Sequence, residues 1–242
     1  VMEMVSENLG TRFTISRINI SFLYRIRLDD VYLQDLSGDT IIHAESLTAG
    51  IRYLNPASKL ISIGSIDLEK ALVTLAIDSA YNLNLNYFLE KLQGDRKGKQ
   101  GGWKVQFNNL KLRESRFNLR SFYYKPVEYG MNYSDIRVYD IDADIKKFNP
   151  NKDSLSFFIK MLRLKEQGGF VLEKMTSKFS QGKTFMSFRD LEITTPYSDI
   201  SGDQITMQFR NWKVFKADSF ERLVRFRINL NKSPFNLKDI GF

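Results

Sequence analysis

The acidic and imidazole side chains are the first candidates for chemistry in this sequence. Asp140, Asp142 and Asp144 alternate along one segment, so in a strand their carboxylates would share one face and could bind calcium through oxygen ligands. The same alternation is typical of the solvent-facing side of a half-buried strand, and we prefer that interpretation. Asp29 and Asp30 form an acidic pair, but they interrupt a strand pattern, where a turn or bulge role is favoured.

The sequence contains few other groups suited to catalysis. His43 is the only histidine and cysteine is absent, which leaves no catalytic triad, no disulfide and no common zinc site. A lone histidine in a strand is usually structural. No phosphate-binding loop, dinucleotide glycine motif or nucleophile elbow occurs. The sequence therefore predicts a protein that is not an enzyme, without catalytic residues, cofactor or metal.

The acidic pair belongs to the pattern that organises the chain. In residues 25–35 the apolar positions are spaced by two, then three, then two residues. Strict alternation would keep them on one face of a strand, and the extra residue at Asp29-Asp30 shifts the phase. A β-bulge at that point restores the phase and bends the strand. The apolar residues of this unit are Ile26, Leu28, Val31 and Leu33.

The same spacing recurs with a small or polar residue at each break, so we predict one bent β unit reused with different insertions. The starts are unevenly spaced, which excludes a solenoid of fixed period. Because a strongly curved sheet requires bulges, the pattern favours a groove-like sheet. The further copies are Phe13, Ile15, Ile18 and Ile20; Ile61, Ile63, Ile66 and Leu68 around Gly64-Ser65; Val105, Phe107, Leu110 and Leu112 around Asn108-Asn109; Met131, Tyr133, Ile136 and Val138 around Ser134-Asp135; and Met186, Phe188, Leu191 and Ile193 around Arg189-Asp190.

Length and charge limit the function classes without choosing among them. The 242 residues suffice for one large β domain or two small ones, and no apolar run is long enough to span a membrane. No signal peptide is present, and the start at Val1 indicates a piece of a longer polypeptide. The net charge of +8 permits attraction to nucleic acid or anionic lipid, but the charges are dispersed, as on an ordinary solvated surface. Aromatic and cationic residues mix near 122–125, 210–216 and 225–227, so nucleic-acid binding stays a minor alternative.

The sequence predicts a mostly β fold, with a curved and bulged antiparallel sheet and one short helix near 84–92. Leu85, Phe88, Leu89 and Leu92 have helical spacing, with Asn84 as N-cap. We divide the chain into a β unit with a terminal helix (1–93), a flexible loop (94–102) and a second β block (103–242). Residues 213–222 fit a helix or a loop. Strands are predicted at 12–22, 24–33, 40–42, 47–53, two within 59–78 broken near Lys70, 103–112, 116–124, 132–146 before a loop at 149–153, 154–164, 170–179, 184–194, 199–209 and 224–230.

The apolar strand faces could line an open groove for acyl chains or pack a closed core, and both interpretations stand because both need apolar residues. The helix could cap one end of such a groove or cover one face of the sheet. The groove candidates are Ile15, Ile18, Ile26, Leu28, Val31, Leu33, Ile61, Ile63, Ile66, Leu68, Val105, Phe107, Leu110 and Leu112, and the helix candidates are Leu85, Phe88, Leu89 and Leu92.

The order of several segments with this spacing resembles that in a known protein family. Residues 13–20 (FTISRINI), 26–35 (IRLDDVYLQD), 38–47 (GDTIIHAESL) and 61–71 (ISIGSIDLEKA) are followed by the 82–92 segment, and residues 103–119 restart the phrase. This order is similar to the N-terminal part of TamB/AsmA-like envelope proteins of Gram-negative bacteria, and in particular to that of the Bacteroidetes members. The likeness covers about residues 11–120, and beyond them only the spacing persists.

The resemblance implies a long periplasmic β structure, anchored in the inner membrane by a helix outside this segment. It implies a non-enzymatic groove for phospholipid acyl chains, transport of phospholipid between the inner and outer membranes, and a possible β-barrel assembly partner in outer-membrane biogenesis. It supplies no catalytic residues. A structural or protein-interaction role, with a sheet edge offered to a partner strand, is the alternative, and nucleic acid is not an expected partner.

Overall fold

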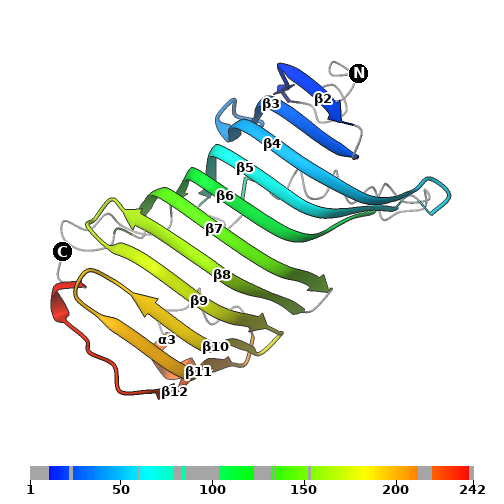
Figure 1. The fold of residues 1–242 in the computed structure, drawn as a ribbon. Helices are drawn as coiled ribbons and strands as arrows, with labels where there is room; N and C mark the ends of the chain where they lie inside the picture. Colours follow the sequence, from blue (N-terminus) through cyan, green and yellow to red (C-terminus); the bar gives the residue numbers. More distant parts are fainter. Residues whose placement is uncertain are drawn as a thin grey trace.

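A single twelve-stranded, twisted sheet dominates the computed structural model, which describes residues 11–21, 24–58, 60–78, 83–84, 104–122, 132, 134–151, 154–211 and 220–239 (Figure 1). The mostly β, bulged fold expected from the sequence is confirmed. The described helical elements are α3 (Phe220–Leu223) and the 3-10 turn η2 (Leu237–Asp239). The strands are β1 (Phe13–Thr14), β2 (Arg17–Ser21), β3 (Arg25–Gln34), β4 (Thr40–Asn55), β5 (Leu60–Ile77), β6 (Lys104–Ser121), β7 (Asp135–Asn151), β8 (Ser154–Glu166), β9 (Val171–Gln181), β10 (Phe185–Thr194), β11 (Asp199–Phe209) and β12 (Val224–Leu230).

Neighbouring strands follow the chain order from β3 to β12, while β1 and β2 both pair with β3 at the first edge. The pairs are antiparallel except for β5 and β6, which run parallel, with Leu68 opposite Leu112. This pair departs from the expected antiparallel sheet. A parallel pair needs a crossover of a dozen or more residues, and the chain between Ile77 and Lys104 supplies that length. The predicted helix residues Leu85, Phe88, Leu89 and Leu92 fall in this segment and lie outside the described residues.

Several strands are longer than the sequence predicts. Residues 40–55 form one strand instead of two, as do 60–77 and 104–121, and β7 continues into the predicted loop 149–153 as far as Asn151. Conversely, the predicted strand 12–22 is divided into β1 and β2. β5 and β6 are continuous because the backbone at Lys70 and Glu114, where the sequence predicts breaks, adopts φ of 46° and 47° without leaving the sheet. What resembles a strand end in the sequence is a bulge inside a continuous strand.

A line of such bulges crosses the sheet, and we call Asp30, Lys70, Glu114 and Asp140 the bulge row. Their φ values lie between 46° and 54°, in the left-handed region that non-glycine residues rarely adopt. From β3 to β6 the register is continuous through the row, since Asp29 pairs with Ser46, Ser46 with Glu69, and Glu69 with Arg113. Asp30, Lys70 and Glu114 therefore lie at one level on β3, β5 and β6, although β4, which runs between the first two, has no residue at positive φ. The predicted bulge at Asp29-Asp30 is confirmed, as is the one at Arg189-Asp190, where Asp190 has φ of 51° and the β9–β10 register shifts.

We expect glycine and valine at Glu114 to reverse their usual order of stability in a strand. Glycine removes a steric cost of about 1 kcal/mol at positive φ, which offsets its entropic penalty of similar size, whereas a β-branched residue fits this conformation poorly. Glu114→Gly should therefore unfold in urea with a free energy of unfolding higher than that of Glu114→Val by about 1–2 kcal/mol. At Gln106, an exposed position of β6 outside the left-handed region, valine should be the more stable. The same order at both positions would contradict the bulge.

Buried residues gather on one side of the sheet near the bulge row. Val31, Ala44 and Ala71 of three adjacent strands are at most 6% exposed. Residues Phe13, Ile15, Leu28, Leu47 and Leu68 pack against them. At the other end of the sheet, Phe209 and Val224 form a second buried cluster with Met186 and Met207.

A buried carboxylate ties the C-terminal segment to the β10–β11 turn. Asp239 Oδ2 accepts a hydrogen bond from Thr195 Oγ1 at 2.7 Å and a short one from Ser198 Oγ. Asp199 N also donates to Pro234 O at 3.0 Å. All three side chains of this cluster are less than 9% exposed, so it fastens residues 231–239 against the end of the sheet.

Candidate functional site

One face of the sheet is apolar across nine strands. Residues paired through their Cα atoms form an unbroken line from β3 to β11, which we call the central apolar row. Side chains of paired residues share a face, so the row is one surface feature. Its members are Leu28, Leu47, Leu68, Leu112, Ala143, Leu162, Met175, Ile193 and Ile200.

The predicted groove residues lie on this face wherever their side chains are described. Two rows on one side of the central apolar row bring Ile66 opposite Leu110 and Ile63 opposite Phe107. Ile26 pairs with Ala49 of β4, and Leu33 pairs with Ile42 of the same strand. Val31 and Ile15 belong to the buried cluster beside the bulge row. Ile18 pairs with Leu28 at the sheet edge but is 50% exposed. Ile61 is paired through its backbone with Val105, whose side chain lies outside the described part.

A file of aromatic rings crosses β6 to β10 on the same face. Successive ring centroids are 4.6 Å apart for Phe107 and Phe148, 6.0 Å for Phe148 and Phe157, 4.6 Å for Phe157 and Phe179, and 5.1 Å for Phe179 and Phe188. Sequence reasoning named only Phe107 as a groove candidate. The other rings occupy alternating positions of their strands, and this alternation is the only feature of the sequence that could have identified them. Their contact with one another depends on which strands are neighbours in the sheet, and local spacing does not show this.

The side chains of the central apolar row are half-buried, with Ala143 alone among its members fully buried, at 4% exposure. A residue that is already buried gains little from a further contact. A half-buried leucine or methionine still presents apolar area, and covering it contributes roughly 25 cal/mol per Å². Contact with an apolar ligand along this row is therefore favourable at each strand it crosses.

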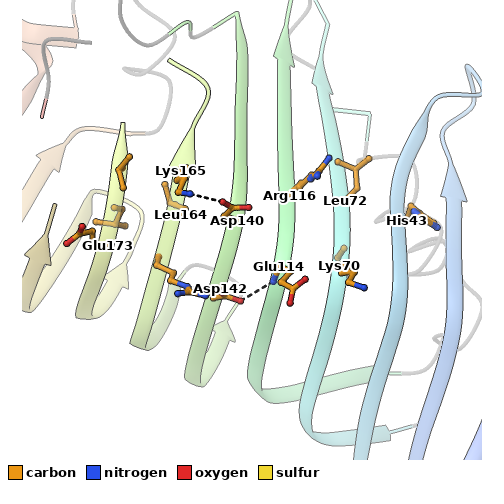
Figure 2. Close-up of a pocket in the computed structure, with 14 residues that line it drawn as sticks. His43, Lys70, Leu72, Glu114, Arg116, Asp140, Asp142, Leu164, Lys165 and Glu173 are labelled. Carbon is orange, nitrogen blue, oxygen red and sulfur yellow. Dashed lines mark hydrogen bonds and ion pairs between the residues drawn. The ribbon is translucent and has the colours of Figure 1, made fainter. Parts of the chain in front are cut away.

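The opposite face holds a charged basin over the bulge row, with a volume of about 990 Å³ (Figure 2). Its charged side chains come from β5 to β9, and His43 of β4 lies at one end. Arg116 and Lys165 stand beside Glu114 and Asp140, so cations and anions alternate. The charged and imidazole residues of the lining are His43, Lys70, Glu114, Arg116, Asp140, Asp142, Arg163, Lys165 and Glu173.

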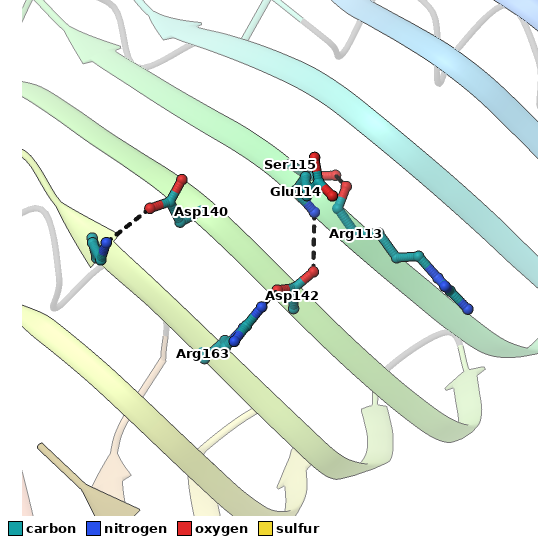
Figure 3. A network of polar contacts seen from close by, with 7 residues as sticks. Arg113, Glu114, Ser115, Asp140, Asp142 and Arg163 are labelled. Atoms are coloured by element: carbon teal, nitrogen blue, oxygen red, sulfur yellow. Dashed lines mark hydrogen bonds and ion pairs between the residues drawn. The ribbon is translucent and has the colours of Figure 1, made fainter.

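Cationic side chains lie within ion-pair distance of the β7 carboxylates Asp140, Asp142 and Asp144, and Figure 3 shows the surroundings of the first two. Asp142 accepts hydrogen bonds from the backbone N of Glu114 at 3.0 Å and from Arg163 Nε at 2.6 Å. Lys165 Nζ lies 3.0 Å from Asp140 Oδ2, and Lys146 Nζ lies 2.9 Å from Asp144 Oδ1. The acidic stripe is thus the polar face of a strand, as we preferred, and its charges bind neighbouring cations of the sheet. Across the described ranges, no group of three or more acidic, histidine or cysteine side chains is placed to hold a metal ion.

A buried serine also connects two strands at the level of the bulge row. Ser115 is 2% exposed, and its Oγ accepts a hydrogen bond from Ala71 N at 3.2 Å while donating to Arg113 O at 3.0 Å. The parallel strands β5 and β6 are therefore joined by a side chain at the level where both are bulged. This contact satisfies a backbone donor that would otherwise be buried without a partner.

His43 belongs to a small polar cluster whose geometry differs from that of a catalytic triad. Its Nε2 lies 2.9 Å from Asp30 Oδ1, and Ser16 Oγ donates to Asp30 Oδ2 at 2.8 Å. The carboxylate therefore lies between the serine and the imidazole, which cannot take the hydroxyl proton directly. The hydrogen bond from His43, followed by that from Ser16, lowers the pKa of Asp30. Any stability that this lowered pKa contributes is present above the unfolded-state pKa and is lost as pH falls through the folded value.

In comparisons with known proteins, no protein-family model and no curated protein matches this chain. In the part of the chain that the structure describes, no helix combines the length and apolar character needed to cross a membrane. The fold and its two faces define an open, bent β-sheet with an apolar surface on one side and an ion-paired surface on the other.

Proposed function

We propose that this chain is a non-enzymatic lipid-carrying protein whose apolar sheet face accommodates the acyl chains of phospholipids. The observation that carries the proposal is the central apolar row, in which nine consecutive strands present an apolar side chain at the same level. Neighbouring strands lie about 4.8 Å apart, so the row extends for roughly 40 Å across the sheet. An acyl chain lying along it contacts carbon at every strand.

The distribution of charge supports the same function. The carboxylates of Asp140 and Asp142 on β7 face the other side, where Lys165 pairs with Asp140 and Arg163 with Asp142. An acyl chain on the apolar face therefore meets no ion pair that must be broken. Apolar contact is non-directional, so it allows a chain to move from one strand to the next without a fixed binding pose.

The resemblance to TamB/AsmA-like proteins supplies the cellular setting of the proposal. In that setting the chain acts in the periplasm, is held at the inner membrane by a helix outside this segment, and carries phospholipid toward the outer membrane. An outer-membrane β-barrel protein is the partner that the resemblance suggests for outer-membrane biogenesis.

A second function, strand addition to a protein partner, is favoured by β12. In the described structure this strand pairs only with β11, and its residues after Val224 are exposed. An edge strand offers backbone groups to an incoming strand. With lipid removed, a photo-crosslinking residue at Ile228 should then trap the β-barrel partner in a mixture of the purified proteins, and the same residue at Arg25 of β3 should not.

The proposed lipid function is tested by the lipid content of the purified chain. The protein is produced in the periplasm of a Gram-negative host, isolated without detergent, and its extract is analysed by mass spectrometry. We expect phospholipid in stoichiometric amount, and we expect the delipidated protein to extract fluorescent phospholipid from vesicles. Protein that is free of lipid and also extracts none would refute the proposal.

A further inference from the structure

A second depression on the polar face differs in chemistry from the basin over the bulge row. It lies over β9, β10 and β11 and has a volume of about 590 Å³, within the range of small-molecule sites. Its lining contains hydroxyl, amide and guanidinium groups and no carboxylate. We call it the hydroxyl–arginine site, formed by Ser180, Thr184, Phe185, Ser187, Arg189, Gln204, Thr206, Gln208 and Phe209.

Two buried hydroxyl groups form the floor of this site. Ser187 and Thr206 are 4% and 7% exposed, and their oxygens lie 3.1 Å apart. Gln204 Nε2 donates to Thr206 Oγ1 at 2.8 Å and to Ser187 Oγ at 3.4 Å. Each hydroxyl has one hydrogen, and only one of the two can lie between the oxygens. Because Gln204 directs its Nε2 donor toward both oxygens, the second hydroxyl hydrogen has no acceptor among the described residues, and the floor presents a buried donor to a ligand.

Arg189 lines this site, and two further arginines of β12 lie beside it on the same face. In the described part of the chain, Arg189 makes no side-chain ion pair, and neither do Arg225 and Arg227, which lie opposite Gln208 and Thr206 on the same face. The nearest acid in sequence, Asp190, is held by Lys178 Nζ at 2.6 Å. The basin over the bulge row balances its own charges, whereas this site has an excess of positive charge and hydrogen-bond donors.

We propose that the hydroxyl–arginine site binds a phosphate-type oxyanion. A phosphate oxygen accepts the free hydroxyl hydrogen of the Ser187–Thr206 pair, and the guanidinium of Arg189 offers the planar donor pair that suits phosphate. The ligand is a soluble phosphate monoester or the phosphate of a lipid headgroup, since both carry the same group. The site is on the face opposite the central apolar row, so the inference is independent of acyl-chain binding.

Titration with inorganic phosphate and glycerol phosphate at low ionic strength tests this proposal on the full chain. We expect saturable binding that weakens as salt rises, and at least about a tenfold loss of affinity in Arg189→Gln, the effect of removing a charged hydrogen bond. Arg120→Gln, an exposed arginine of β6 elsewhere in the sheet, is the matched control and should bind as the parent does. Arg189 is exposed, so its variant should melt at the parent temperature.

The source of the phosphate is distinguished with vesicles of phosphatidylcholine containing phosphatidic acid. Binding of the soluble monoesters alone identifies a soluble ligand, and tighter binding to the phosphatidic acid vesicles identifies a headgroup. In both cases Arg189→Gln must weaken binding. The proposal is overturned if the parent binds none of these probes, or if the two arginine variants lose affinity equally, because diffuse positive charge would then explain the binding.

Discussion

Leu112→Asp is expected to abolish lipid binding while the sheet remains folded. Leu112 lies near the middle of the central apolar row, opposite Leu68 on β5 and Ala143 on β7. A carboxylate there must lose its hydration when an acyl chain covers it, which disfavours the lipid complex strongly. Without lipid the half-buried position leaves the charge in contact with water, so the free energy of unfolding should fall by only about 1–3 kcal/mol.

The control for this substitution lies on the same strand but on the other face. Asn118→Asp introduces the same charge opposite Thr74 and Arg137, and it should leave both lipid content and stability near the parent values. Lipid is measured by extraction and mass spectrometry, and stability by urea unfolding. Should Leu112→Asp fail to fold, this position is part of the core of the sheet and not a ligand-contact position. Should it fold and retain full lipid, the acyl chains lie elsewhere.

Local spacing predicted part of this fold well. The shift between Leu28 and Val31 could be recognised because the bulge acts within a few residues of one strand. The bulges at Lys70 and Glu114 resemble strand ends in the sequence, since lysine and glutamate rarely adopt positive φ and no glycine marks these positions. Only the matching bulges of adjacent strands make these conformations sustainable, and strand adjacency is not visible in local spacing.

The candidate sites show the same division between local and long-range information. Alternation identified Ile66, Leu68, Leu110 and Leu112 as residues of one face, but it could not show that β5 and β6 run parallel and bring them into register. The aromatic file and the hydroxyl–arginine site both combine residues from several strands. Ser187 and Thr206 are unremarkable as single residues, and their chemistry arises from a pairing that the sheet creates.

Phe179→Ala is expected to be the most destabilising truncation on the apolar face. Phe179 is 9% exposed, and its ring contacts those of Phe157 and Phe188 on the two neighbouring strands. Removing a buried phenylalanine ring costs about 3–5 kcal/mol, including the cavity left behind. Phe179→Leu should lose less, because it retains apolar volume and gives up mainly the ring–ring interaction, about 0.5–1.5 kcal/mol per pair.

Urea unfolding of the delipidated protein measures this effect, with Phe122→Ala as the control. Phe122 is 73% exposed, so its truncation should change the free energy of unfolding by no more than about 0.5 kcal/mol. A loss below about 1 kcal/mol for Phe179→Ala would show that the aromatic file does not hold these strands together. Because Phe179 is buried and Leu112 is half-buried, the two positions separate the roles of the face: the aromatic file stabilises the sheet, and the central apolar row remains available to a ligand.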